Sequence, residues 1–252
     1  MIRLRVVTYN IHKCRGLDRR VDPDRIAAVL GEFDADVIAL QEILDAQNGK
    51  PEWDQARRIH AKFPAYHRCF GENRPLRGGR YGNMTLSRFP VRFCRNYDVS
   101  WRRRERRGCL RSDLLLKDGS VLHLFNVHLG TSFLERRHQA RVLLGPDVIN
   151  LRECCGSRIV VGDFNEWTRG LASRLMGEVF EVLDPRAFAR YPRSYPGFFP
   201  LLHLDHFYYD SQLSLKSFRI HRGRKALVAS DHLPMIAEFE FKPSRPLAGG
   251  AP

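Results

Sequence analysis

The chain has 252 residues, 43% of them hydrophobic, which is enough for a sizeable core and excludes a largely disordered protein. Its 42 Lys and Arg residues, 35 of them Arg, exceed the 28 acidic residues and give a net charge of +14. This charge favours an anionic partner, such as nucleic acid, an anionic lipid surface or a phosphorylated small molecule, because the planar guanidinium of Arg suits phosphate groups. A general bias toward Arg without a specific partner is the alternative explanation.

The cysteines and the hydropathy pattern bear on location. Six cysteines, at positions 14, 69, 94, 109, 154 and 155, form no C-x-x-C pair and have no regular spacing. We therefore predict neither a zinc site nor a disulfide framework, and expect the cysteines to be reduced. The chain opens directly into a predicted strand and has no apolar run of membrane-spanning length. We expect a cytoplasmic monomer, with peripheral contact to an anionic membrane as a further option.

Strands and helices alternate from the start of the chain. A strand is predicted at residues 2–9, a helix from Asp22-Pro23 to about Gly31, a strand at residues 36–42 and a helix at residues 56–63. Asp22 is the expected N-cap, and Pro23 suits the first helical turn. Strand, helix and strand in this order are typical of an α/β fold. We expect one domain over residues 1–242 and a disordered tail at residues 243–252.

The middle and end of the chain add antiparallel signals. Residues 71–82 are rich in Gly, Arg and Pro and predict an exposed loop before a strand at 83–87. Strands at 91–99 and 109–116 flank an Arg-rich loop at 102–107, and a turn at 117–120 leads into a strand at 121–128. Helical patterns follow at 133–152 and 170–176, and strands at 159–165, 204–208, 214–221 and 236–241, with a long loop at 185–200.

Polar side chains gather where these strands end. The most informative segment is the apolar run at 159–162, which ends in Asp163 and Asn165. Residues i and i+2 of a strand point to the same side, so these two side chains can converge on one ligand. Four further segments show the same pattern, and they carry Asn10 with His12, Gln41 with Glu42, Asn126 with His128, and Asp231 with His232.

Carboxylates with Asn and His, and without Cys, make an oxygen-rich site that suits Mg²⁺ or Mn²⁺ rather than zinc. A hard cation beside these groups suggests phosphoryl chemistry, in which the metal neutralises phosphate oxygens while a carboxylate or His activates water. Asp205 can fix the tautomer of His232 and raise its basicity. The sequence therefore predicts a metal-dependent phosphoryl hydrolase.

Six short motifs together identify a family. They are Thr8-Tyr9-Asn10, Leu40-Gln41-Glu42, Asn126-Val127-His128-Leu129, Gly162-Asp163-Phe164-Asn165, Leu204-Asp205-His206 and Ser230-Asp231-His232. In this order they resemble the endonuclease/exonuclease/phosphatase superfamily over nearly the entire chain. The resemblance implies a four-layered α/β sandwich of the DNase I type, with two packed mixed β-sheets and helices outside, and metal-dependent hydrolysis of phosphodiesters or phosphomonoesters.

The resemblance also implies the metal ligands and substrate contacts. Glu42 resembles the principal metal ligand of the family, Asn10 the Asn that supports metal and phosphate, and Asp231 a second metal-linked acid. Arg111, on a predicted strand, could bind a substrate phosphate bidentately, with a solvent-facing Arg as the alternative. Asn83 lies in a segment that matches the family branch described below and is assigned to substrate binding.

The catalytic groups follow in the same way. Asp163 resembles the carboxylate that positions or deprotonates the attacking water, and Asn165 its hydrogen-bonding neighbour. His128 resembles the His that contacts the scissile phosphate, and His232, braced by Asp205, the essential His of the family. Either Asp163 or His232 can act as the general base.

Other polar residues near the motifs have a structural interpretation. We expect His12, His123 and His206 to be hydrogen-bonded structural histidines, and Asn126 to bond the backbone at a strand end. Gln41 is expected to orient Glu42. The Arg-rich loop at 102–107, with Trp101 beside it, either contacts nucleic acid or lipid or is simply solvated.

The substrate prediction rests on departures within the family. Ile43-Leu44 follows Glu42 where abasic-site endonucleases have Thr-Lys, which argues against a dedicated repair nuclease. The segments 10–13, 81–83 and 107–111 are similar to a bacterial branch of uncharacterised hydrolases related to sphingomyelinase-type phospholipases. We predict a Mg²⁺-dependent phosphodiesterase acting on a phospholipid headgroup or another phosphodiester, with a DNA or RNA nuclease as the alternative and an inactive binding module third. A lipid enzyme predicts an apolar rim, for which residues 198–202 are the candidate, and a nuclease predicts a basic groove with stacking aromatics.

Overall fold

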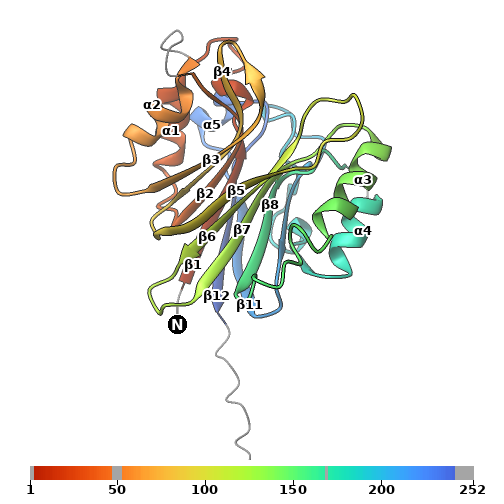
Figure 1. Ribbon diagram of the computed structural model, residues 1–252. Helices are drawn as coiled ribbons and strands as arrows, with labels where there is room; N and C mark the ends of the chain where they lie inside the picture. The colour runs from red at the N-terminus through yellow and green to blue at the C-terminus, as the bar shows by residue number, and fades with distance from the viewer. Residues whose placement is uncertain (1–2, 47–52, 168–169, 242–252) are drawn as a thin grey trace, which may run out of the picture.

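The structure, a computed structural model, describes residues 3–46, 53–167 and 170–241. Two six-stranded mixed sheets pack against each other, and helices cover the outer face of each (Figure 1). The predicted four-layered α/β sandwich is therefore confirmed. The expected tail at residues 243–252 lies outside the described residues.

The first sheet has the strand order β11-β12-β1-β2-β4-β3. Its strands are β1 (Arg3–Asn10), β2 (Val37–Asp45), β3 (His67–Leu76), β4 (Gly79–Ser87), β11 (Leu213–Ile220) and β12 (Met235–Phe241). The parallel pair β1 and β2 lies at its centre, joined by α1 (Pro23–Leu30), which the side chain of Asp22 caps as predicted. Helices α2 (Gln55–Ala61) and α5 (Arg224–Ala229) contribute to the same outer layer, in which Ile26, Ile59 and Ala226 pack on the sheet.

The second sheet has the order β5-β6-β7-β8-β10-β9. Its strands are β5 (Val91–Asp98), β6 (Gly108–Leu115), β7 (Val121–His128), β8 (Ser157–Asp163), β9 (Glu181–Val182) and β10 (Asp205–Tyr209). The parallel pair β7 and β8 brings His128 opposite Asp163. The outer helices are α3 (Phe133–Leu143) and α4 (Leu171–Gly177); α3 ends before Gly145-Pro146, because Pro cannot continue a helix.

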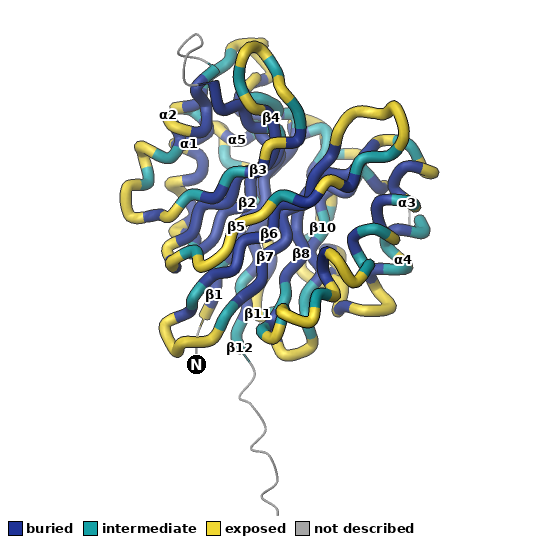
Figure 2. The backbone as a smooth tube through the Cα atoms, in the orientation of Figure 1, coloured by how far each residue is buried: buried dark blue, intermediate teal, exposed yellow. Residues whose placement is uncertain are grey.

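The interior between the sheets changes character along the strands. Apolar side chains such as Val6, Leu124 and Phe239 fill most of it, and the central strands are buried along their length (Figure 2). Toward the site, Gln41 Nε2 donates to Asn126 Oδ1 at 2.8 Å, and Asn126 Nδ2 donates to the carbonyl of Leu40 at 3.1 Å. Asn126 is thus a structural link between the sheets, and the prediction that Gln41 orients Glu42 is wrong.

The predicted loop at residues 71–82 is instead a β-hairpin. Strands β3 and β4 pair through it and turn at Arg77 and Gly78, whose φ angles are 52° and 74°. The glycines that suggested a loop serve close strand packing, since a Cβ on Gly82 would lie 1.8 Å from the carbonyl oxygen of Gly71. The short strand β9 and the short helix α5 were also not predicted.

The prediction that all six cysteines are reduced is wrong for one pair. Cys69 on β3 and Cys94 on β5 form a disulfide across a sequence separation of 25 residues. It joins edge strands of the two sheets, a neighbourhood that spacing along the chain does not reveal. The four other cysteines are free. Among the described residues, no helix is long and apolar enough to cross a membrane.

Candidate active site

Three predicted residues converge where the central parallel strands end. Asn10 Nδ2 lies 2.9 Å from Asp163 Oδ2 and 3.3 Å from Glu42 Oε1, so one amide nitrogen joins both carboxylates. Glu42 sits where the pairing of β2 with β4 is irregular, and its φ of 58° turns it out of the strand alternation. The site therefore combines residues from both sheets, as expected for strand ends that meet at one edge.

A second group supplies a histidine with an acidic partner. His232 Nδ1 donates to Asp205 Oδ2 at 3.0 Å, and that oxygen also accepts a 2.7 Å hydrogen bond from Ser194 Oγ. Burial opposes the charge on His232, but Asp205 and Asp163 outweigh it and raise the pKa of His232. Burial likewise works against ionisation of Asp205, and His232 lowers its pKa on balance. At neutral pH the pair is an imidazolium beside a carboxylate.

Asp163 lies between two histidines. Its Oδ2 is 3.6 Å from His128 Nε2 and 3.7 Å from His232 Nε2, and the side chain is almost fully buried. Burial, assisted by the charge of Asp205, raises the pKa of Asp163. Burial first and the charge of Arg107 second lower the pKa of His128, so this imidazole is neutral at pH 7. The two histidines therefore differ in charge on either side of one carboxylate.

Two cations that the sequence did not single out complete the site. A guanidinium nitrogen of Arg107 lies 3.0 Å from His128 Nδ1, and the side chain is only 7% exposed. Lys13 forms an ion pair with Glu42. Burial would raise the pKa of Glu42, but His128 and Lys13 shift it downward, and because His128 is neutral, Lys13 supplies the effective charge. Lys13 directly follows the Asn10-Ile11-His12 motif, and this proximity could have identified it as a site residue. Arg107 belongs to a run of arginines, and nothing in the sequence distinguishes it from the others.

Asn165 and Asp231 lie next to the central groups. β8 ends at Asp163, and Asn165 follows with a φ of 50°, so the two do not share a strand face as predicted. Instead the backbone N–H of Asn165 donates to Asp163 Oδ1 at 2.8 Å, and its side chain donates to the carbonyl of Leu129. Asp231 Oδ1 lies 3.4 Å from His12 Nδ1 and is partly exposed. Both residues thus border the site.

The two residues predicted to bind substrate are held by structural contacts. Arg111 stands opposite Phe125 on the outer face of the second sheet and forms two hydrogen bonds, at 2.8 and 2.6 Å, with Asp113. The prediction for Arg111 is therefore wrong, because β7 presents His128 on the opposite face. Asn83 is fully buried, and its amide donates to the carbonyls of Gly108 and Asn126 at 3.2 Å. It links the sheets beside the site.

The donor set fits a hard divalent cation. The carboxylates of Glu42 and Asp163 share the amide of Asn10, and carboxylate oxygens of Asp163 and Asp205 lie within 4.8 Å of each other. His232 also lies within this distance, but as an imidazolium bonded to Asp205 it has no free lone pair for a metal. Oxygen donors of this kind suit Mg²⁺ or Mn²⁺, and no free cysteine lies among them. The ammonium group of Lys13 forms an ion pair with the Glu42 carboxylate. A metal cation bound by Glu42 would have to displace that ammonium group.

A sandwich of two mixed sheets with this carboxylate and histidine cluster at one edge defines a DNase I-like hydrolase. The chain belongs to the Endonuclease/Exonuclease/phosphatase family, whose model matches residues 7–232. Members of this family are hydrolases that act on phosphate esters, and this protein is such an enzyme. The chain is also 30% identical over 255 residues to the uncharacterized protein YbhP of Escherichia coli K12, covering 94% of this chain and 96% of that one.

Solved structures share the fold. An endonuclease/exonuclease/phosphatase from Bacteroides vulgatus superposes with a TM-score of 0.79 at 19% identity, covering 96% of this chain and all of that one. A mannosyl-6-phosphatase from Bacteroides thetaiotaomicron gives 0.77 at 19% identity, covering 94% of this chain and 100% of that one. At these identities the likeness establishes the fold, and the substrate has to be argued from the site and its surroundings.

Proposed function

We propose that the protein is a Mg²⁺-dependent phosphodiesterase whose substrate is a phospholipid headgroup ester. The observation that carries the catalytic part is the amide of Asn10, which joins Glu42 and Asp163 beside two histidines of different charge. Glu42, Asn10 and Asp231 would hold the metal. A bound Mg²⁺ would neutralise phosphate charge and lower the pKa of water.

The protein's own groups divide the remaining work. Asp163, with Asn165 bonded to it, orients the attacking water and accepts its proton. His232 donates from Nε2 toward the charge that develops on phosphate, because Asp205 holds the ring protonated through Nδ1. Arg107 presents a guanidinium beside His128, where it can bind a phosphate oxygen.

The lipid part of the proposal rests on apolar side chains around the site. Gly197 N–H donates to the carbonyl of Asp231 at 2.7 Å. This bond holds the chain beside the site immediately before Phe198 and Phe199. These two side chains are 67% and 64% exposed. Phe133 and Leu134, which follow β7 closely, are 52% and 55% exposed. Each of these two pairs of neighbouring exposed apolar side chains favours contact with an apolar surface.

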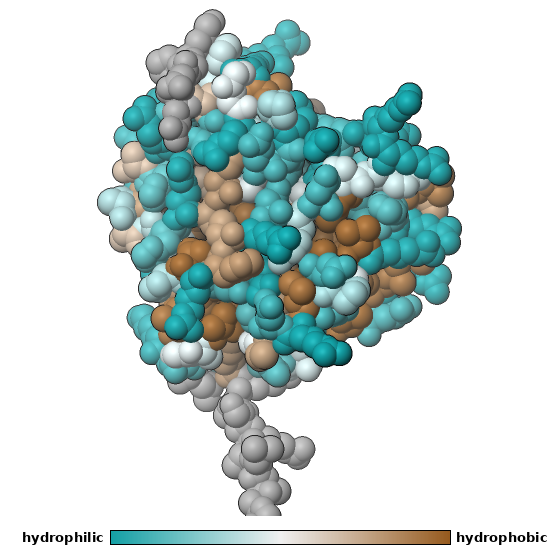
Figure 3. Space-filling view, in the orientation of Figure 1, coloured by the Kyte–Doolittle hydropathy of each residue, from teal (hydrophilic) through white to brown (hydrophobic). Residues whose placement is uncertain are grey.

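The surface has apolar patches among abundant polar and charged side chains (Figure 3). A nuclease remains the second candidate because Arg102, Arg103 and Arg104 are exposed on the loop that leads to Arg107. Trp101 on that loop is partly exposed, and such a residue can stack on a base. The Arg loop suits a nucleic acid and the Phe pair suits a lipid, so substrate assays have to separate them.

The first experiment tests catalysis. Hydrolysis of bis(p-nitrophenyl) phosphate is measured with Mg²⁺, Mn²⁺ or EDTA for wild type, Glu42→Gln and His232→Ala. We expect activity only with metal and a loss of at least about 100-fold in both variants. Activity that survives EDTA or both substitutions would reject this site.

The second experiment separates lipid from nucleic acid. Release of phosphorylated headgroups is measured from vesicles of phosphatidylcholine with phosphatidylglycerol or sphingomyelin, beside cleavage of DNA and RNA oligonucleotides. We expect Phe198→Ser/Phe199→Ser to lower vesicle hydrolysis and binding while leaving soluble-substrate turnover unchanged. Val179→Ser/Val182→Ser, which removes two exposed apolar side chains from the opposite end of the second sheet, is the matched control. Cleavage of oligonucleotides alone would establish the nuclease instead.

A further inference from the structure

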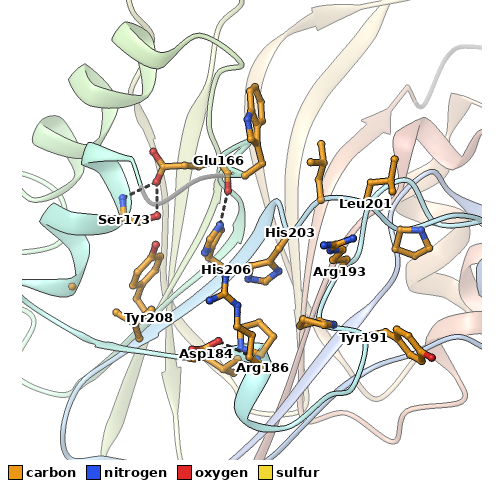
Figure 4. Close-up of a pocket in the computed structure, with 18 of the residues that line it drawn as sticks. Glu166, Ser173, Asp184, Arg186, Tyr191, Arg193, Leu201, His203, His206 and Tyr208 are labelled. Carbon is orange, nitrogen blue, oxygen red and sulfur yellow. Dashed lines mark hydrogen bonds between the residues drawn. The ribbon is translucent and has the colours of Figure 1, made fainter.

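A large cavity lies on the other face of β10 from the Asp205 and His232 pair. Its volume is about 870 Å³, within the range of roughly 300–1,000 Å³ that is typical of small-molecule sites. α4, the segment 182–193 and the segment 200–203 form its walls (Figure 4). His206 lines it whereas Asp205, one residue earlier on β10, faces the catalytic site, because successive strand residues point to opposite sides.

The segment 193–195 contacts both the catalytic pair and the cavity. Ser194 bonds Asp205, and the ring of Tyr195 lies 4.8 Å from the ring of His232. Arg193, the residue before Ser194, lines the cavity. The cavity is therefore separated from the catalytic pair by a single layer of chain.

The cavity is rich in arginines that lack acidic partners. Four of them line it: Arg174, Arg186, Arg190 and Arg193. Among the described residues, none of the four has a carboxylate oxygen within the 4.0 Å of an ion pair. Figure 4 shows Arg186 and Arg193 with His203 between them in this view. Burial is the main cause that lowers the pKa of His203, and the charges of His206 and Arg186 lower it further. Guanidinium groups gathered in a concave site favour an anion with several oxygens, above all phosphate.

Acidic residues do not cancel this charge. Three carboxylates line the cavity: Glu166, Glu178 and Asp184. Glu166 is buried and accepts from the backbone N–H of Ser173 at 2.8 Å, and Asp184 accepts from the backbone N–H of Arg186 at 3.0 Å. Glu166 also lies 3.9 Å from Arg136, which is not one of the four lining arginines. The four arginines therefore outnumber the two remaining carboxylates, Glu178 and Asp184, and positive charge prevails in the cavity.

The walls also offer a place for a flat or apolar group. Trp167, which follows the catalytic motif, is 53% exposed, and Leu201 and Tyr191 are exposed beside the cavity. A ligand with a flat ring would cover these exposed side chains, which inorganic phosphate is too small to do.

We propose that this cavity is a second binding site, for a small organic phosphate with a flat ring. The phosphate binds Arg186 and Arg193, and the ring lies against Trp167 and Leu201. This site is separate from the metal-binding residues, and binding to it requires no catalysis.

Isothermal titration calorimetry tests the proposal with AMP as the probe and with EDTA present, so that no turnover occurs. We expect wild type to bind AMP, Arg186→Ala/Arg193→Ala to bind at least about tenfold more weakly, and adenosine, which lacks the phosphate, to bind at least tenfold more weakly than AMP to wild type. Arg19→Ala/Arg20→Ala removes the same charge from an exposed loop to which no binding role is assigned and is the matched control. Its AMP affinity should equal that of wild type.

A further variant covers the ring. Trp167→Ala should weaken AMP binding about fivefold or more and leave ribose 5-phosphate binding unchanged, and thermal unfolding of each variant verifies that it is folded. Equal weakening by the two Arg pairs would show a net-charge effect and overturn the proposal. So would no AMP binding to wild type at millimolar concentration, or equal affinity for adenosine and AMP.

Discussion

Asp205 Oδ2 lies 3.0 Å from His232 Nδ1, and both side chains are almost completely buried. The contact holds the proton on Nδ1 and directs Nε2 toward Asp163 Oδ2, 3.7 Å away. Ser194 bonds the same oxygen of Asp205, so the carboxylate is held from two sides. The orientation and charge of His232 therefore depend on a residue that faces the ring from β10.

Asp205→Asn should lower kcat strongly with a small change in KM. Asn keeps the shape but removes the charge that raises the pKa of His232, and it can present its N–H₂ group to the ring, which favours the wrong tautomer. The expected loss is roughly 10²- to 10⁴-fold, by analogy with buried acid–histidine pairs. Steady-state kinetics with bis(p-nitrophenyl) phosphate from pH 5 to 10 measures it. Ser194→Ala is the comparison and should cost about tenfold or less; equal effects of the two changes would contradict a special role for the charge.

Lys13→Met should tighten metal binding. Lys13 forms an ion pair with Glu42, and a cation beside a metal ligand disfavours a second cation through Coulomb repulsion. We expect the Kd for Mn²⁺, measured by calorimetry or electron paramagnetic resonance, to fall at least about fivefold. Lys62→Met is the control, since Lys62 is exposed and lies 3.8 Å from Asp24 away from the site. Unchanged or weaker Mn²⁺ binding by Lys13→Met would show that Lys13 does not compete with the metal.

The sequence was sufficient to predict the carboxylate and histidine cluster, because the carboxyl ends of parallel strands meet at one edge of a sheet. Asn10 and Asp163 follow from this rule, whereas the side chain of Glu42 also depends on the irregular pairing of β2 with β4 and on its φ of 58°. Lys13 and Arg107 do not follow from the rule, since Lys13 lies in a turn with a φ of 57° and Arg107 stands just before β6. Side chains that enter a site from turns leave no periodic pattern.

Replacing Cys94 by Ala should destabilise the fold. The Cys69–Cys94 bond closes a loop of about 25 residues between the edge strands of the two sheets, and a loop of this length corresponds to about 3 kcal/mol. Urea unfolding with and without reductant measures the difference. Reductant should lower the stability of wild type by a similar amount and leave Cys94→Ala unchanged. Cys154→Ala, at a free cysteine, is the control, and an insensitive wild type would show that the bond does not form.

The sequence also did not reveal which face of the sheet each strand residue occupies. Arg111 was expected at the site because it lies on a strand that approaches the edge, but one residue along a strand reverses the side to which a side chain points. In the structure Arg111 is 3% exposed and bonds Asp113, which also accepts from His123 Nδ1 at 2.8 Å. Register, which only the paired strands define, therefore decides between a site residue and a structural one.

The Arg111, Asp113 and His123 cluster should make stability depend on pH. Burial opposes the charge of Asp113, yet His123 and Arg111 lower its pKa overall. A carboxyl group whose pKa is lower in the folded state than in the unfolded state stabilises the fold above the unfolded value, about 4, and this contribution is lost as pH falls through the folded pKa.

Asp113→Ala should therefore cost about 3 kcal/mol at pH 7, because it leaves a buried Arg unpaired, and progressively less below pH 4. Urea unfolding of wild type and variant at matched pH values gives the difference directly, so that acid effects common to both cancel. Asp118→Ala, on the exposed turn before β7, should cost less than about 1 kcal/mol. A cost for Asp113→Ala that stays constant from pH 7 to pH 3 would mean that the charge of Asp113 contributes nothing and that only its packing matters.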